Sequence, residues 1–205
     1  MHPPARPMAR IVRAYLGAVR RGVSQARNDA IDDVESLRRR IHLVGEEIDA
    51  SATGYVARVA SIDPRRFVQA SVVSFWRETN LSLIRTVEDD ALRAVQDLYS
   101  ANPLGVTAAQ IQEVVEVSEA RAKFWARDQA LKLNSAIEIE RALDVGIFEY
   151  EWDARDDELT RPMHAALDGE TFQLSDPPVT NEQGDHNHPG GDYQCRCTMR
   201  FRVNY

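Results

Sequence analysis

The chain has 205 residues, a net charge of −7 and a hydrophobic share of 43%, which are ordinary values for one large or two small globular domains. No apolar run approaches the roughly 20 residues of a membrane span, and no apolar block with a cleavage site follows the N-terminus. We therefore expect neither a membrane protein nor a secretory leader. The two cysteines, separated by one residue, exclude a secreted disulfide framework and favour reduced thiols or metal-bound thiolates.

Charge is divided unevenly between the two ends of the chain. Residues 1–27 contain six Arg and no Asp or Glu, whereas residues 149–192 contain twelve acidic residues against two Arg. This split predicts different partners at the two ends. The basic arm is a candidate contact for nucleic acid or an acidic protein surface, through Arg13, Arg20 and Arg21. On its own, a solvated helix face is the stronger interpretation of the same arginines.

The first hundred residues show helical periodicity. Three prolines should keep residues 1–7 out of a helix, as a loose arm. Asp63 and Pro64 are typical of a helix start, since Asp accepts from free N–H groups and Pro fits the first turn. Gly54 is a candidate break. Apolar spacing of three and four predicts helices over residues 8–26, 28–50 and 64–99.

The second half begins with two more predicted helices. Thr107 to Gln110 forms a capping box for a short helix ending near Ser118, and a further helix covers 119–144 with Gly146 at its end. The period then changes from 3.6 to 2, which indicates strands. The remaining predicted elements are a strand at 147–152, a helical turn at 162–167, a tight turn at Asp168–Gly169, a strand at 171–174, a loop at 175–194 and a strand at 195–203.

These patterns predict an α+β fold that is mostly α. We expect an N-terminal helical region with the basic arm over residues 1–105 and a second domain over 106–205. The second domain would contain helices within 107–145 and a module of short strands and loops over 147–205.

The last predicted strand places different residue types on its two faces. Because strand side chains alternate, Cys195 and Cys197 share an apolar face with Met199, Phe201 and Val203. The opposite face carries a stripe of three arginines, which are further candidate contacts for nucleic acid: Arg196, Arg200 and Arg202.

Cysteine and histidine side chains gather near this strand. Two sulfurs and two imidazole nitrogens make a tetrahedral zinc set, for which we select His164, His188, Cys195 and Cys197. His186 is a spare candidate. The module has a small apolar content, which favours stabilisation by a bound metal. The alternative is equally open: the cysteines are small buried apolar groups and the histidines are surface residues.

A catalytic interpretation of the same region is a metal-dependent hydrolase or toxin-like module using Asp157, His164 and the cysteine pair. Acyl transfer also needs an oxyanion site, usually at a helix N-terminus, and a cysteine inside a terminal strand offers none. We therefore expect no enzymatic activity. Asp157 and Arg161 are instead predicted to form an ion pair or backbone clamp that sets the turn before His164.

Several short motifs follow one another along this part of the chain. They are Glu151-Trp152, Asp157-Glu158, Thr160-Arg161-Pro162-Met163-His164, Leu167-Asp168-Gly169 with Phe172, Asp176-Pro177-Pro178, His188-Pro189-Gly190 and Cys195-Arg196-Cys197. The series resembles the phage Mu F-like minor head (head morphogenesis) proteins over about residues 120–200. One departure is Leu159, which stands where that family has an arginine.

The resemblance implies a structural protein with no established enzyme activity. It implies a few copies inside the head of a tailed phage or prophage, at the portal vertex, aiding head assembly and DNA packaging or delivery. Its implied partners are the portal protein and other capsid or scaffold proteins, with DNA as a further candidate. Its implied location is the virion, and the host cytoplasm during assembly. An alternative is an adaptor protein that is stabilised by a bound metal and has no role in the virion.

Overall fold

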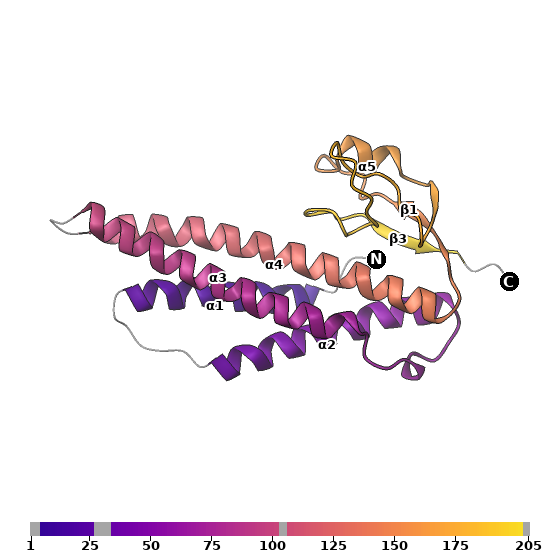
Figure 1. Cartoon of the computed structure of the whole chain (residues 1–205), viewed down its shortest axis with the longest axis horizontal. Coiled ribbons are helices and arrows are strands. Elements are labelled where there is room, and N and C mark those ends of the chain that lie inside the picture. The colour runs from indigo at the N-terminus through magenta and orange to yellow at the C-terminus, as the bar shows by residue number, and fades with distance from the viewer. Residues whose placement is uncertain (1–4, 27–33, 103–105, 203–205) are drawn as a thin grey trace. The chain divides into compact units, whose positions relative to one another are not determined.

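The computed structural model describes residues 5–26, 34–102 and 106–202 (Figure 1). These ranges contain five α-helices, one 3-10 turn and three strands, which confirms the mostly α, α+β fold class. None of the described helices is long and apolar enough to cross a membrane. The elements are α1 (Ala5–Ala26), α2 (Val34–Val59), η1 (Pro64–Arg66), α3 (Val72–Ala101), α4 (Ala108–Asp144), β1 (Glu149–Asp153), α5 (Pro162–Ala166), β2 (Thr171–Gln173) and β3 (Thr198–Phe201).

The chain divides into two compact units. The mixed unit comprises Met1–Ala5, Glu46–Ser74 and Asp128–Tyr205, and the helical unit comprises Arg6–Gly45 and Phe75–Arg127. These units are defined by compactness, and each combines separate stretches of the chain. They do not test the predicted domain boundary at residue 105, which stays a prediction.

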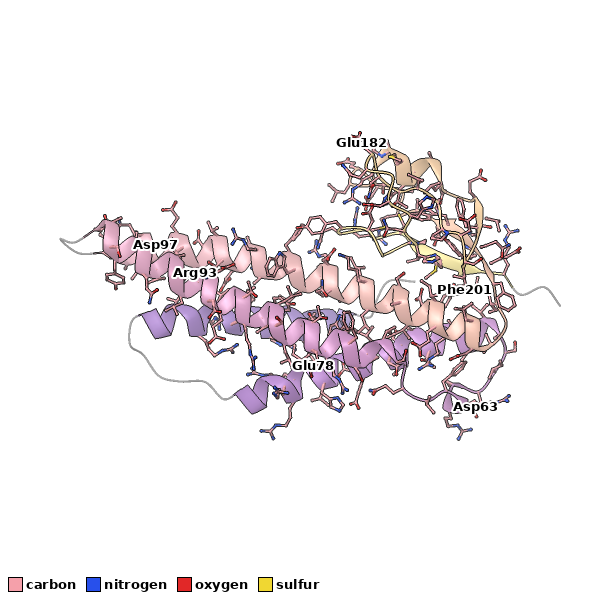
Figure 2. The ribbon with its side chains drawn as sticks, viewed as in Figure 1. Asp63, Glu78, Arg93, Asp97, Glu182 and Phe201 are labelled. Carbon is pink, nitrogen blue, oxygen red and sulfur yellow. The ribbon has the colours of Figure 1, made fainter. Side chains whose placement is uncertain are left out.

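The helical unit is held by packing and by two polar pairs between α1 and α3, one buried and one partly buried. The Tyr15 hydroxyl donates to Asn80 Oδ1 at 2.7 Å, and Arg21 Nε donates to Glu88 Oε2 at 3.0 Å. Gly22 allows a close approach, because a Cβ there would overlap the carbonyl oxygen of Glu88. The exposed face of α3 is charged, as Figure 2 shows at Glu78, Arg93 and Asp97.

Two expectations about the N-terminal helices are wrong. Helix α1 begins at Ala5 and contains Pro7, so residues 5–7 are not a loose arm. A proline in the first turn lacks only an N–H that has no helical partner anyway. Helix α2 runs through Gly54 to Val59, since buried Val56 and Ala57 outweigh the roughly 1 kcal/mol helix cost of a glycine. The predicted start at residue 28 lies outside the described residues.

The predicted helix start at Asp63 is correct only locally. Asp63 Oδ1 accepts from the Arg65 backbone N–H at 2.9 Å, but the helix is the short η1, and α3 begins only at Val72. Glu140 of α4 accepts from the Ser71 N–H at 2.8 Å and thereby caps the start of α3. The predicted apolar face fails at Val68 and at Phe75, which are 82% and 78% exposed.

Helix α4 is continuous, so the predicted end near Ser118 is wrong. Its capping box is confirmed, because Thr107 Oγ1 accepts from the Gln110 N–H at 3.3 Å and Gln110 Oε1 accepts from the Thr107 N–H at 2.9 Å. No Gly or Pro interrupts residues 106–145. The predicted end is confirmed at Gly146, whose φ of 76° suits a glycine. Leu143, expected to face inward, is 48% exposed.

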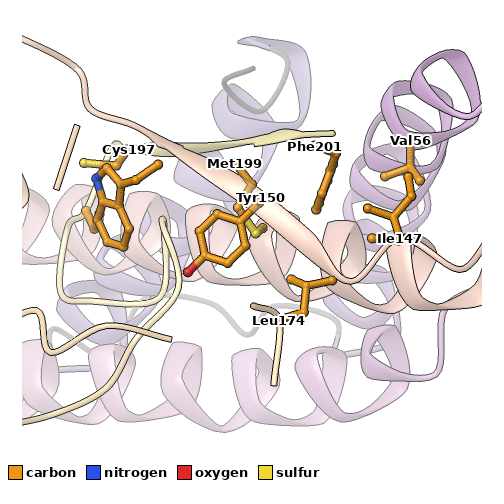
Figure 3. Packing of buried hydrophobic residues seen from close by; sticks show 10 residues of the cluster. Val56, Ile147, Tyr150, Leu174, Cys197, Met199 and Phe201 are labelled. Atoms are coloured by element: carbon orange, nitrogen blue, oxygen red, sulfur yellow. The ribbon is translucent and has the colours of Figure 1, made fainter. Parts of the chain in front are cut away.

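The three strands form an antiparallel sheet in the order β2-β1-β3. Tyr150 pairs with Phe172 and Trp152 pairs with Met199. Phe148, expected to share the inner face, lies before β1 and is 60% exposed. The buried cluster beneath the sheet is shown in Figure 3, where Val56, Ile147, Tyr150, Leu174, Cys197, Met199 and Phe201 are labelled.

Strand β3 begins at Thr198, so the two cysteines precede it instead of lying within it. The alternation nevertheless holds: Cys195, Cys197, Met199 and Phe201 are buried. The sheet and this approach to it therefore bring both thiols to the interior of the mixed unit.

Candidate metal centre

Three side chains with metal-binding atoms meet inside the mixed unit. His164 comes from α5, and Cys195 and Cys197 come from the segment before β3. His164 Nδ1 lies 3.5 Å from Cys195 Sγ and 3.7 Å from Cys197 Sγ. The residues are 2%, 2% and 5% exposed. Among the described residues this is the one group of three or more potential metal-binding side chains whose donor atoms all lie within 4.8 Å.

The loop from β1 to α5 positions His164. Asp157 Oδ1 accepts from the Leu159 N–H at 3.1 Å, and the Asp157 N–H donates to Thr160 Oγ1 at 3.2 Å, which closes the turn before α5. Pro162 then starts the helix with its φ already suited to it. The Trp152 ring of β1 stands edge-on to the His164 ring, with centroids 5.5 Å apart. The turn and the Trp152 ring therefore position the imidazole.

The turn at Asp168 and Gly169 secures β1 beside α5. Asp168 Oδ1 accepts from the Ala154 N–H at 2.8 Å, and the Gly169 N–H donates to the Trp152 carbonyl at 2.9 Å. Gly169 has a φ of 77°, a conformation that a side chain would strain. These hydrogen bonds confirm the predicted tight turn and join Gly169 of that turn to Trp152 of β1.

The segment before the cysteines is fixed to α4. Ser135 Oγ donates to the Pro189 carbonyl at 2.6 Å, and Asp128 Oδ1 accepts from the Gln194 N–H at 2.7 Å. A Cβ at Gly190 would come within 3.1 Å of Ser135 Cβ, so the backbone approaches the helix closely. The Gly190 N–H also donates to Cys195 Sγ at 3.3 Å. The thiols are thus placed by a rigid frame and not by a free loop.

Asp192 completes the cluster, and the sequence analysis did not select it. Its Oδ2 lies 3.2 Å from His164 Nε2 and 3.7 Å from Arg161 Nη1. A carboxylate on one ring nitrogen sets the tautomer and turns the other nitrogen towards its ligands. Asp192 lies three residues before Cys195, but this position does not single it out in the sequence. Residues 149–192 contain twelve acidic residues, and any of them could have been a candidate.

The electrostatics of the cluster favour one thiolate. A hydrogen bond from the Cys195 thiol, reinforced by His164, lowers the pKa of Cys197 to about 5. The same pairing with Cys197, together with burial, raises the pKa of Cys195. The pKa of His164 is raised, first by its hydrogen bond with Cys197. The first proton of the cysteine pair therefore leaves readily beside this histidine.

The other predicted ligands lie elsewhere. His188, chosen as the fourth ligand, is not in the cluster: its Nδ1 lies 3.2 Å from the Tyr150 hydroxyl. Burial lowers the pKa of His188. His186 Nδ1 lies 2.6 Å from the Pro177 carbonyl on the surface. Loop position alone did not distinguish these histidines from His164.

The predicted pair of Asp157 and Arg161 is wrong, although the backbone clamp by Asp157 is correct. Asp157 binds both terminal nitrogens of Arg196, at 2.6 and 2.5 Å. Arg161 donates instead to the Tyr193 carbonyl. Asp157 is consequently outside the histidine and cysteine cluster to which the hydrolase alternative assigned it.

Most of the arginines selected as nucleic-acid contacts hold carboxylates. Arg200 binds Glu151 at 2.5 Å and Asp153 at 2.7 Å, and Arg202 also binds Glu151. Arg196 is held by Asp157, and Arg21 by Glu88. Arg13 and Arg20 are exposed on α1. The stripe of Arg196, Arg200 and Arg202 is therefore largely neutralised by carboxylates of β1 and of the loop that follows it, and DNA binding stays a prediction.

The fold and cluster define a mostly helical protein that carries a small β-module clamped by polar side chains. The model of the family described as Phage Mu protein F like protein matches residues 86–200, more than half of the 205 residues. The chain therefore belongs to the Phage Mu protein F like family, as the motifs of residues 120–200 predicted.

An uncharacterised protein of Haemophilus influenzae is 40% identical over 125 residues, which are 58% of this chain and 27% of that protein. The chain thus spans little more than a quarter of the length of this curated relative. No solved structure gives a significant match.

Proposed function

We propose that the chain acts as a minor head protein of a tailed phage or prophage, located at the portal vertex inside the virion. It would aid head assembly and DNA packaging or delivery through contacts with the portal protein and other capsid or scaffold proteins. The observation that carries this proposal is the family match over residues 86–200, which includes all of α4 and nearly all of the three-stranded sheet.

The charge arrangement of the β-module supports a protein partner over DNA. Arg200 and Arg202 already neutralise Glu151, and Arg196 holds Asp157, so this face offers mixed charge and not a basic groove. Nucleic-acid binding draws its affinity from unpaired cations that release counterions from phosphates. A mixed-charge face suits a protein surface of complementary pattern.

The burial of the cluster supports a role without turnover. His164, Cys195 and Cys197 are each at most 5% exposed, which leaves no open approach for a substrate to either sulfur. Asp157, the proposed acid or base of the hydrolase alternative, is bound to Arg196 on the surface. We therefore propose that the β-module is an assembly element and not a catalytic domain.

The test is removal of the gene from a phage or prophage that encodes this chain, with complementation in trans. Purified heads would be examined by electron microscopy with antibody labelling and assayed for packaged DNA. We expect the protein at one vertex and a loss of DNA-filled, infectious heads on deletion. Normal yields of filled heads without the gene, or absence of the protein from virions, would overturn the proposal.

A further inference from the structure

We propose that His164, Cys195 and Cys197 bind a zinc ion, and that Asp192 orients the histidine for it. Zinc takes thiolates at about 2.3 Å and imidazole nitrogen at about 2.0–2.1 Å, so a tetrahedral ion holds sulfur and nitrogen about 3.5 Å apart. The distances from His164 Nδ1 to the two sulfurs are 3.5 and 3.7 Å. These two distances therefore match the nitrogen–sulfur edges of a tetrahedral zinc site, and the two sulfurs lie within 4.8 Å of each other.

The frame that holds these donors is independent of any ion. Gly190 and its neighbours are fixed to α4 through Ser135, and Asp157 closes the turn before His164. Each donor comes with its backbone held by hydrogen bonds, so binding would cost little conformational entropy.

Zinc requires thiolates, and a backbone N–H reaches each of the two sulfurs. The Gly190 N–H donates to Cys195 Sγ at 3.3 Å, and the Arg155 backbone N–H bonds to Cys197. Hydrogen bonds from amides stabilise negative charge on sulfur, and these two reach separate thiols.

Asp192 supplies the carboxylate partner that zinc-bound histidines commonly have. With Nε2–H directed to Asp192 Oδ2 at 3.2 Å, the lone pair of Nδ1 faces the two sulfurs. Asp192 is itself placed by Arg161, whose Nη1 lies 3.7 Å away. It is a positioning residue: its loss should weaken zinc binding without removing a ligand.

Three protein donors leave one position of a four-coordinate ion for a further ligand. The ion would link α5 to the segment before β3. Such a link would stabilise a module whose sheet is too small to bury a large core. This inference concerns the chain by itself, so it stands or falls separately from the role in phage heads.

The test uses the full reduced chain, with elemental analysis and cobalt substitution. We expect about one zinc per chain, and with Co²⁺ the intense visible bands of a tetrahedral site plus a thiolate charge-transfer band. His188→Ala, the matched control, should retain the metal, whereas His164→Ala and Cys197→Ser should lose it. Asp192→Asn should keep the stoichiometry but bind about 10–100-fold more weakly.

If a ligand variant fails to fold, the cobalt spectrum of the unaltered chain still tests whether the site binds metal. Absence of zinc and cobalt uptake by the reduced chain would overturn the proposal, as would equal metal loss in His188→Ala. Iodoacetamide labelling is compared for the zinc-loaded and the metal-free chain, since both thiols are buried and react only when the fold opens locally. Zinc should slow the labelling of both thiols, and equal rates with and without the metal would contradict the proposal.

Discussion

Arg141 Nη2 of α4 lies 3.2 Å from Asp49 Oδ1 of α2, and this ion pair is buried in the mixed unit. Arg141 is 1% exposed, and its Nε also donates to Thr53 Oγ1 at 3.0 Å. Asp49 Oδ2 accepts from the Ala70 N–H at 3.2 Å. A single arginine thus ties α4, α2 and the segment before α3.

Replacement of Arg141 should strongly destabilise the protein. Arg141→Ala leaves Asp49 buried without its charge partner, and loss of one member of such a pair costs about 3–5 kcal/mol. The measurement is the free energy of unfolding in denaturant. Arg93→Ala is the control, since Arg93 pairs with Asp90 on the surface and should cost less than about 1 kcal/mol. Equal effects of the two changes would contradict the account.

Glu138 should make stability fall as pH rises. Burial raises its pKa to about 7 from the ordinary 4.5, so the folded chain binds the proton more tightly than the unfolded chain. The cost of its charge is absent below pH 4.5 and complete above pH 7. At about 1.4 kcal/mol per pKa unit, Glu138→Gln should stabilise by up to about 3 kcal/mol at alkaline pH.

The measurement for Glu138→Gln is a series of denaturation curves from acid to alkaline pH. The stabilisation should vanish in acid, where the native glutamic acid is already neutral. Glu113→Gln, at an exposed position of α4, is the control for removal of a carboxylate from the surface. A pH-independent effect of the Glu138 change would show that the proton is not responsible.

Two glycines of α1 should respond oppositely to alanine. A Cβ at Gly22 would overlap the Glu88 carbonyl, so Gly22→Ala should cost about 1–3 kcal/mol through overpacking of α1 on α3. A Cβ at Gly17 would meet only the end of the Arg21 side chain, at 3.5 Å. Gly17→Ala should therefore stabilise by up to about 1 kcal/mol through helix propensity. Thermal unfolding distinguishes the signs, and destabilisation by both would contradict the packing argument.

Arg200 of β3 and Arg202, which follows the strand, should contribute little to DNA affinity. Arg200 and Arg202 share Glu151, so Arg200→Gln with Arg202→Gln should leave binding to a random duplex nearly unchanged at low and at raised salt. The measurement is fluorescence anisotropy over a salt series. Arg13→Gln with Arg20→Gln is the matched comparison, because those side chains are exposed on α1. A reduced salt slope in the first pair would show that β3 contacts phosphate.

Local signals in the sequence predicted the elements that depend on neighbouring residues. The capping box at Thr107, the helix end at Gly146 and the turn at Asp168 each arise within a few positions of the chain. The alternation from Cys195 to Phe201 likewise survives in the structure, although the strand itself begins later.

Elements that depend on distant residues were mistaken. The start of α3 is capped by Glu140, 69 positions from Ser71, and no local pattern encodes that distance. The break expected at Gly54 failed because burial of nearby α2 residues outweighs a weak helix propensity.

By itself the sequence determined the α+β class, the family, the paired thiols and the tight turns, because periodicity, caps and turn residues act through adjacent positions. Only the tertiary structure decided that His164 and not His188 joins the cysteines, that Asp192 orients it, and that Arg196 and not Arg161 binds Asp157. These contacts depend on which loops the sheet and α4 bring together. The paired residues are 28 to 39 positions apart, and no periodic pattern in the sequence indicates that they are in contact.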